Sequence, residues 1–371
     1  MELKLNYTVK SLVDVSQQLE NAGLNPWSTS AELSRYDFES IVYSGVEHPR
    51  VTPYGSDSGT WRRINNSGGC IAWFNGLRVA AAGKNYSITA RGEEYYASRI
   101  AVGSTIGALI VAFYTGRYTS IAYSTTRSIR VVEDAYKGIP VECSAGFKLF
   151  ACTFRDGRSL VISESELWDL GVPARAIALL WDNSALVESS GWLVKTRRGE
   201  IKPITLAEGV FAGFSGQQPL FTKNNLLVAL EGSSLVEIAG VESGLATGFG
   251  SIIVIDKGRV LEVLNQDGEQ EAVLEKSSDT RCWASRSGIL CCRGAFCGLV
   301  EPGESYLKLE DIRGEPRDIV VKAAIPVWVN GAPIRGDSAI MHLGECRVQS
   351  CRLKVSHLLG DLHLETLLVD S

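Results

Sequence analysis

The chain has 371 residues and a mass of 40.2 kDa, which is enough for two or three domains. Its 45% hydrophobic content excludes wholesale disorder, because disordered chains are poor in apolar residues. The formal net charge of −5 argues against a strongly basic nucleic-acid binder. The composition therefore predicts a folded protein with a sizeable core, and it indicates an architecture more clearly than a function.

The N-terminal region is predicted to contain one strand and one helix. Residues Glu2–Val9 alternate between polar and apolar side chains, as a strand does. Lys10–Ala22 carries its leucine, valine and alanine side chains at helical spacing, which predicts an amphipathic helix. No long apolar run follows a basic start, so this segment is not a signal peptide. We therefore expect an intracellular, cytoplasmic protein.

Residues 26–69 are polar, loop-like and rich in aromatic side chains. So long a loop inside a domain is unusual unless it binds something or packs as an irregular arm. Tryptophan and tyrosine side chains anchor many protein interfaces. We therefore expect this arm to contact a protein partner through Trp27, Tyr36, Phe38, Tyr43, Tyr54 and Trp61.

Short apolar runs separated by glycine turns dominate the middle of the chain. Asn75-Gly76 is typical of a type I′ hairpin turn, because both residues tolerate a positive φ. The second turn residues of seven such units stand at positions 76, 116, 157, 199, 225, 258 and 288. A mean interval of about 35 residues is close to the repeat length of propeller blades. Several of the runs are apolar on both faces, so each needs sheet neighbours that ring closure supplies.

These patterns predict an all-β protein built on a seven-bladed β-propeller, with six to eight blades allowed. The predicted domains are an N-terminal strand, helix and arm over 1–67, the propeller over 68–304 and a C-terminal β-strand region over 305–371. A pair of β-sandwiches or an irregular sheet stack remains the alternative. The last region should form a small β-sandwich from Tyr306–Leu309, Ile319–Val329, Ala339–Leu343, Arg347–Val355 and Leu362–Val369.

Two tryptophan–aspartate pairs resemble a motif of WD40 propellers. Trp168-Asp169 and Trp181-Asp182 stand 13 residues apart, whereas that family repeats at about 40 residues. The glycine–histidine partner of the motif is absent from the sequence. Over 68–304 the chain is therefore similar to WD40-like proteins in architecture only. The resemblance transfers no functional residue.

The nine cysteines suggest mostly free thiols, because their number is odd and no secretion signal precedes them. A turn at Arg286-Ser287 would place Cys282 directly opposite Cys291, which makes them candidates for a disulfide. A buried thiol pair and a metal site remain the alternatives. The spacing Cys292-x₄-Cys297 only approaches that of zinc ligands, and no histidine lies beside it. We therefore expect no metal and no cofactor.

No catalytic set is apparent in the sequence. There is no G-x-S-x-G motif, and none of the four histidines lies in the repeated region. Gly244–Gly250 lacks the lysine of a phosphate-binding loop and is interpreted as a loop between blades. The sequence thus predicts a non-enzymatic scaffold or adaptor that mediates protein–protein interaction in a multi-subunit complex. Arg197 and Arg198, on a predicted hairpin tip, would add electrostatic steering.

Two other functions remain open at this point. The first is a carbohydrate- or metabolite-acting propeller enzyme whose central channel carries acidic residues. The second is an accessory subunit of a nucleic-acid-processing assembly, suggested by the basic run Lys195–Lys202. The acids considered for the enzyme are Asp57, Glu142, Asp156 and Glu188.

Overall fold

The computed structural model describes residues 2–14, 50–51, 70–74, 76–82, 84–105, 108–125, 128–164, 166–197, 200–241, 245–285, 288–293, 296–312, 318–323, 327–329, 332–334, 338–342 and 350–367. Every regular element in these ranges is a β-strand, which confirms the predicted all-β class. The same ranges contain no helix of the length and apolarity that a membrane span requires.

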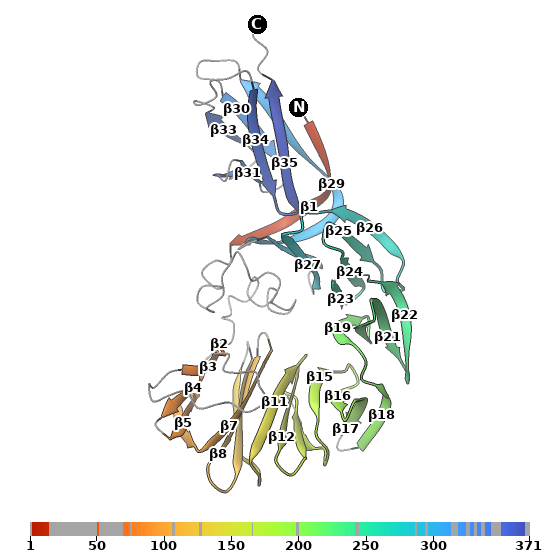
Figure 1. Ribbon diagram of the computed structural model, residues 1–371. Coiled ribbons are helices and arrows are strands. Elements are labelled where there is room, and N and C mark those ends of the chain that lie inside the picture. Colours follow the sequence, from red (N-terminus) through yellow and green to blue (C-terminus); the bar gives the residue numbers. More distant parts are fainter. Residues whose placement is uncertain are drawn as a thin grey trace.

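Consecutive antiparallel hairpins form four-stranded sheets, which are the blades of a β-propeller. Figure 1 shows them arranged in chain order around a common centre. The first three blades consist of β3 (Cys70–Phe74), β4 (Leu77–Ala82), β5 (Asn85–Ala90) and β6 (Glu93–Ala97); β7 (Arg99–Thr105), β8 (Ala108–Tyr114), β9 (Thr119–Thr125) and β10 (Ile129–Tyr136); and β11 (Pro140–Gly146), β12 (Leu149–Phe154), β13 (Ser159–Ile162) and β14 (Leu167–Asp169). The short strand β2 (Arg50–Val51) pairs with β3.

The next three blades continue the same meander. They consist of β15 (Arg175–Leu179), β16 (Ala185–Ser189), β17 (Trp192–Arg197) and β18 (Glu200–Leu206); β19 (Val210–Ser215), β20 (Gln218–Lys223), β21 (Leu226–Glu231) and β22 (Ser234–Gly240); and β23 (Leu245–Phe249), β24 (Ile252–Asp256), β25 (Val260–Leu264) and β26 (Gln270–Glu275). Gly244–Gly250 was predicted to be a loop between blades, and this prediction is wrong because it contains the inner strand β23.

A further sheet begins with β27 (Thr280–Ser285) and β28 (Gly288–Arg293) and continues into β29 (Phe296–Ile312). Its outermost strand is the N-terminal strand β1 (Glu2–Asp14), which pairs with β29. The count of seven blades stays a prediction, because residues 15–49 and 52–69 lie outside the described residues.

The core lies between neighbouring blades. Ile88 and Phe113 belong to one buried cluster, which joins the β3–β6 blade to the β7–β10 blade. Tyr123 and Phe150 pack in the next interface as a tilted pair, with ring centroids 5.1 Å apart. Strands that are buried on both faces, such as β8, therefore contact both adjacent blades. This arrangement explains why the apolar runs in the sequence show no alternation.

The inner strand is the first strand of each blade, and adjacent inner strands lie very close together. A Cβ atom on Gly146 would stand 2.3 Å from the carbonyl oxygen of Ile177 in the next blade. A Cβ atom on Gly103 would stand 2.5 Å from the carbonyl oxygen of Cys143, and one on Gly248 would stand 2.7 Å from the carbonyl oxygen of Phe214. Glycine is required at these positions because the obstructing atom belongs to backbone that cannot rotate away.

We expect Gly146→Ala to lower the free energy of unfolding by about 1–3 kcal/mol, because the added methyl group overpacks two blades. Gly240→Ala is the matched control, since its Cβ atom would meet nothing within 4 Å. Chemical denaturation of both variants measures the difference. Equal stability of the two variants would contradict the proposed close packing.

The predicted helix over Lys10–Ala22 is wrong for Lys10–Asp14, which lie in strand β1. Val9 to Asp14 pair with residues 296–300 of β29, so the free edge of β29 stabilises a strand where local spacing favoured a helix. Residues 15–22 of the prediction lie outside the described residues.

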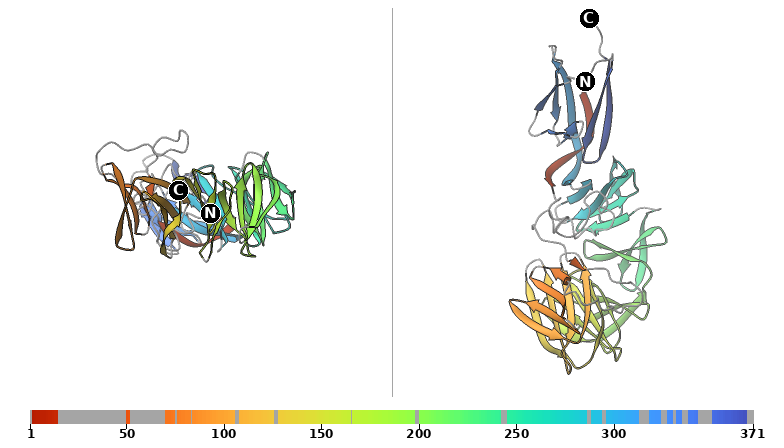
Figure 2. Two further views of the ribbon diagram at one scale, coloured as in Figure 1. Left: turned by 90° about the horizontal axis from the view of Figure 1, so that it is seen from below. Right: turned by 60° about the vertical axis from the view of Figure 1, so that its left-hand side comes forward.

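The C-terminal strands project from the β27–β29 side of the ring (Figures 1 and 2). The second half of β29 pairs with β30 (Asp318–Ala323), which pairs with β33 (Ser338–His342). A separate sheet has the order β32-β31-β34-β35. Its strands are β31 (Val327–Val329), β32 (Ala332–Ile334), β34 (Ser350–His357) and β35 (Gly360–Leu367). The single predicted strand Ile319–Val329 is therefore two strands in different sheets.

The turn between β34 and β35 is seated against the propeller. Arg293 donates from Nη1 to the carbonyl oxygens of His357 and Gly360 at 3.1 and 2.8 Å, and it pairs with Asp361 at 2.7 Å. Thr280 donates from Oγ1 to the Leu358 oxygen at 2.9 Å. Leu358 itself is buried in the cluster of the last blade. We call this set of contacts the joint.

Candidate functional site

The inner strands run parallel to one another, so all of them begin on the same face of the ring. The parallel pairings Phe147 with Ala178 and Gly213 with Gly248 establish this direction. We call the side on which the inner strands begin the start face and the opposite side the end face. Seen from below in Figure 2, the strands stand upright between these two faces. Because each blade is antiparallel, its third strand also begins on the start face and its fourth strand ends there.

Large apolar side chains gather on the start face. Val141, Val210 and Leu245 stand at or next to the first residue of an inner strand, and all three are exposed. Trp192 begins β17 and Leu206 ends β18, and both are exposed as well. These five side chains come from four blades, so only the arrangement of the blades around a common centre brings them to one side.

Three of these exposed apolar residues lie where the β15–β18 blade connects to the β19–β22 blade. Trp192 is directly opposite Leu206 in the β17–β18 register. The turn that follows is held by hydrogen bonds from Ala207 N to Gly191 O at 2.8 Å and from Glu208 N to Leu206 O at 2.9 Å. Val210 comes next and is 72% exposed. We call Trp192, Leu206 and Val210 the apolar patch.

Charged residues also lie on the start face, and four of them form two ion pairs. Glu208 forms an ion pair with Lys223 beside Val210. Arg175, the first residue of β15, lies opposite Glu188 in the strand register. Arg158 and Asp169 form an ion pair at 2.6 Å on the same face. Charged side chains therefore share the start face with the apolar patch, as they do around many interface cores.

The acids considered for an enzyme are not brought together. Glu142 is exposed on β11, and Glu188 lies on β16 in the next blade. Asp156 accepts a hydrogen bond from the Tyr136 hydroxyl at 2.6 Å. Burial and this hydrogen bond raise the pKa of Tyr136 to about 12. Asp57 lies outside the described residues.

No hydrogen bond or ion pair joins Glu142, Asp156 and Glu188 within the part of the chain that the structure describes. The same part contains no group of three histidine, cysteine or acidic side chains that could hold a metal.

The remaining predicted contacts are placed only in part. Arg197 is exposed at the end of β17, on the end face, and Arg198 lies outside the described residues. The aromatic arm residues also lie outside them: Trp27, Tyr36, Phe38, Tyr43, Tyr54 and Trp61. The apolar patch was missed because strand periodicity does not show which end of a strand is exposed. The only sequence signal was an apolar residue directly beside a turn.

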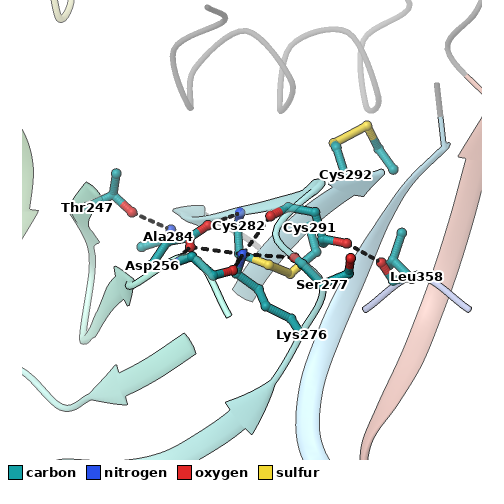
Figure 3. Close-up of a disulfide and its surroundings, with 12 residues drawn as sticks. Thr247, Asp256, Lys276, Ser277, Cys282, Ala284, Cys291, Cys292 and Leu358 are labelled. Carbon is teal, nitrogen blue, oxygen red and sulfur yellow. Dashed lines mark hydrogen bonds and ion pairs between the residues drawn. A yellow bond between two sulfur atoms is a disulfide. The ribbon is translucent and has the colours of Figure 1, made fainter. Parts of the chain in front are cut away.

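Three disulfides join directly paired strands among the described residues (Figure 3 shows two of them). Cys282 is bonded to Cys291 across β27 and β28, at the pairing that the hairpin geometry suggested. Cys143–Cys152 and Cys292–Cys297 are the other two. All six cysteines are buried. Oxidised in this way, their sulfur atoms are not thiolate ligands for a metal.

No family model matches the sequence, and no curated protein matches it. Among solved structures, BamB from Moraxella catarrhalis matches with 11% identity and a TM-score of 0.28, over 61% of this chain and 94% of that chain. The WD40 β-propeller domain of Doa1 matches with 11% identity and a TM-score of 0.30, over 61% and 89%. The β-propeller domain of Myceliophteria thermophila Cps50 (Swd1) matches with 11% identity and a TM-score of 0.32, over 65% and 98%. At these TM-scores the matches carry no functional argument, and the sheet topology itself identifies the chain as a β-propeller.

Proposed function

We propose that this protein is a non-enzymatic scaffold that binds a protein partner on its start face. The observation that supports this proposal is the exposure of Trp192, Leu206 and Val210 at the start-face ends of their strands, where two consecutive blades are joined. Exposed large apolar side chains that gather on one face are typical of a protein-interaction site. Exposing apolar surface to water is unfavourable, so burying it against a partner lowers the free energy.

Rigidity supports the same proposal. Strand pairing and turn hydrogen bonds hold all three patch residues, so binding would order little additional backbone. Tryptophan is enriched among the residues that dominate binding energy, which makes Trp192 the expected anchor. The proposed role in a multi-subunit complex follows from this use of the propeller as a preformed surface.

We also propose the intracellular location that the sequence suggests. Three buried disulfides are compatible with it in a hyperthermophile, because intracellular disulfides persist in such organisms. The low methionine content, two residues in 371, fits the same source.

The test is co-purification of the tagged full-length chain from its native source, compared with two variants. Trp192→Ala should weaken the partner's affinity by about 30-fold or more, as expected for an interface anchor. Val236→Asp is the matched control, because Val236 is also exposed but lies on the outer strand β22. Equal partner recovery with wild type and Trp192→Ala would contradict a partner site on the start face.

A further inference from the structure

A second exposed tryptophan lies on the opposite side of the ring, in the turn between β15 and β16. Trp181 is 63% exposed. The turn is closed by hydrogen bonds from Leu180 N to Ser184 O at 2.8 Å and from Asn183 N to Leu180 O at 3.0 Å. Asn183 adopts the positive φ of 60° that such a turn requires and that asparagine tolerates. Trp181 is thus presented by a fixed backbone.

The neighbour of Trp181 strengthens this turn. Asp182 accepts hydrogen bonds on Oδ1 from the Ser184 backbone N and hydroxyl. Its Oδ2 pairs with the Lys195 ammonium at 2.6 Å. These contacts hold the pKa of Asp182 at about 2 against the opposing effect of burial. The carboxylate therefore stays charged and keeps the turn attached to strand β17 at any pH near neutrality.

Cationic side chains surround the turn. Lys195 and Arg197 are two residues apart on β17 and so share one side of the strand. Lys202 lies directly opposite Lys195 on β18, and such like-charge pairs are unfavourable without a counter-charge. Lys148 belongs to the preceding blade, and its backbone lies beside the turn because Leu179 N donates to Phe147 O at 2.8 Å. Its ammonium stands 5.3 Å from the centroid of the Phe147 ring. We call Trp181, Lys148, Lys195, Arg197 and Lys202 the cationic patch.

The cationic patch has an excess of positive charge. It has four cationic residues and two nearby carboxylates, those of Asp182, which pairs with Lys195, and of Glu200, which is opposite Arg197 in the register. Within the described part of the patch, Lys195 forms an ion pair with Asp182. The patch is cationic although the whole chain carries a formal charge of −5.

We propose that the cationic patch binds an acidic segment of a second partner protein, with Trp181 packing against an apolar or aromatic side chain of that segment. Its charge complements carboxylates, and the fixed tryptophan adds an apolar contact. A nucleic acid fits less well, because a long phosphate backbone would extend past the patch to exposed Glu164 and Glu166 on the same face of the adjacent blade, whereas a short acidic segment stays within the patch. The site lies on the end face, so it goes beyond the proposed function and would let the scaffold hold two partners.

The experiment measures fluorescence anisotropy of a fluorescein-labelled, glutamate-rich peptide that contains one phenylalanine, titrated with the full-length protein at low salt. Trp181→Ala and the double variant Arg197→Glu/Lys202→Glu should each weaken binding about tenfold or more. Added salt should also weaken it, because the attraction is electrostatic. The conservative double variant Arg197→Lys/Lys202→Arg should retain binding.

Two controls make the outcome decisive. The start-face variant Trp192→Ala should bind the peptide like wild type, so a failed start face and a failed end face are distinguishable. Thermal unfolding of each variant shows whether it is folded, which is expected because the substituted side chains are exposed. Three outcomes would each overturn the proposal. The wild-type protein does not bind the peptide, the Trp181 and charge-reversal variants bind it as tightly as wild type, or a single-stranded oligonucleotide binds more tightly than the peptide.

Discussion

Replacing Asp256 by alanine is expected to lower the free energy of unfolding by about 3–5 kcal/mol, because it leaves the Lys276 ammonium buried without its counter-charge. Both side chains are 0% exposed, and Lys276 Nζ lies 2.9 Å from Asp256 Oδ1. Figure 3 shows Lys276 beside Asp256. Lys276 also donates to the carbonyl oxygens of Gly258 and Thr280, each at 2.6 Å. Burial lowers the pKa of Lys276, and Asp256 opposes that effect.

This ion pair has a large expected effect because it joins two blades. Asp256 ends β24 and accepts a hydrogen bond on Oδ2 from the backbone N of Cys282 in β27 at 3.2 Å. Lys276 follows β26 and reaches the first residue of β27. The pair thus fastens the β23–β26 blade to the last blade, beside the Cys282–Cys291 disulfide.

Guanidinium denaturation measures the expected loss, and two further variants interpret it. Glu208→Ala removes one partner of the partly exposed pair with Lys223, so its effect should stay below about 1 kcal/mol. Asp256→Ala combined with Lys276→Met should lose less stability than Asp256→Ala alone, since no charge is then left buried. A double variant that is less stable than the single variant would contradict this explanation.

The second large effect is a loss of stability as the pH falls from about 6.5 to about 4. His357 is buried in the joint, where burial and the nearby Arg293 guanidinium lower its pKa from 6.5 to about 4, against the opposing charge of Asp361. The unfolded chain therefore binds a proton on this ring before the folded chain does. Its contribution is fully present above pH 6.5 and decreases until about pH 4, by up to about 3 kcal/mol.

The hydrogen bond between His357 and Tyr7 also predicts a loss of stability as the pH falls. The Tyr7 hydroxyl and Nδ1 of His357 share a hydrogen bond. Burial raises the pKa of the hydroxyl, so it remains protonated and is the donor in the tautomer whose proton is on Nε2. A protonated ring has no acceptor for this bond. Tyr7 belongs to β1 and His357 to β34, so protonation weakens the attachment of the C-terminal sheet to the N-terminal strand.

Unfolding free energies of wild type and His357→Asn between pH 7 and pH 4 provide the measurement. The variant should be less stable at pH 7 and should show a flatter pH dependence, because asparagine does not titrate. Identical slopes for the two proteins across this range would contradict the assignment to His357.

Local turn chemistry was enough to predict the hairpins. The tips proposed from the sequence lie in real hairpins, including Asn224-Asn225 with φ angles of 50° and 63°. Their uneven intervals have a simple cause, because the tips fall in different hairpins of different blades. The second strands begin at residues 77, 108, 149, 185, 218, 252 and 288, which gives more even intervals of 31 to 41 residues.

Strand β1 shows why a local pattern can fail. The spacing of apolar residues after Lys10 favoured a helix, yet Ser11–Asp14 pair with the edge of β29 some 280 residues further along the chain. A helix of a few turns is marginal in isolation, whereas an open strand edge supplies backbone partners at once. Nothing near Lys10 in the sequence indicates that this edge exists.

The sequence by itself determined the all-β class, the turns and the propeller repeat, because these depend on residues that are neighbours along the chain. Only the tertiary structure decided which apolar and charged residues share a face. Val210 and Leu245 start strands in two blades, and Phe147 of a third blade accepts a backbone hydrogen bond from Leu179, next to the turn that carries Trp181. Such neighbours are set by the packing of one blade against the next, and that packing leaves no local pattern in the sequence.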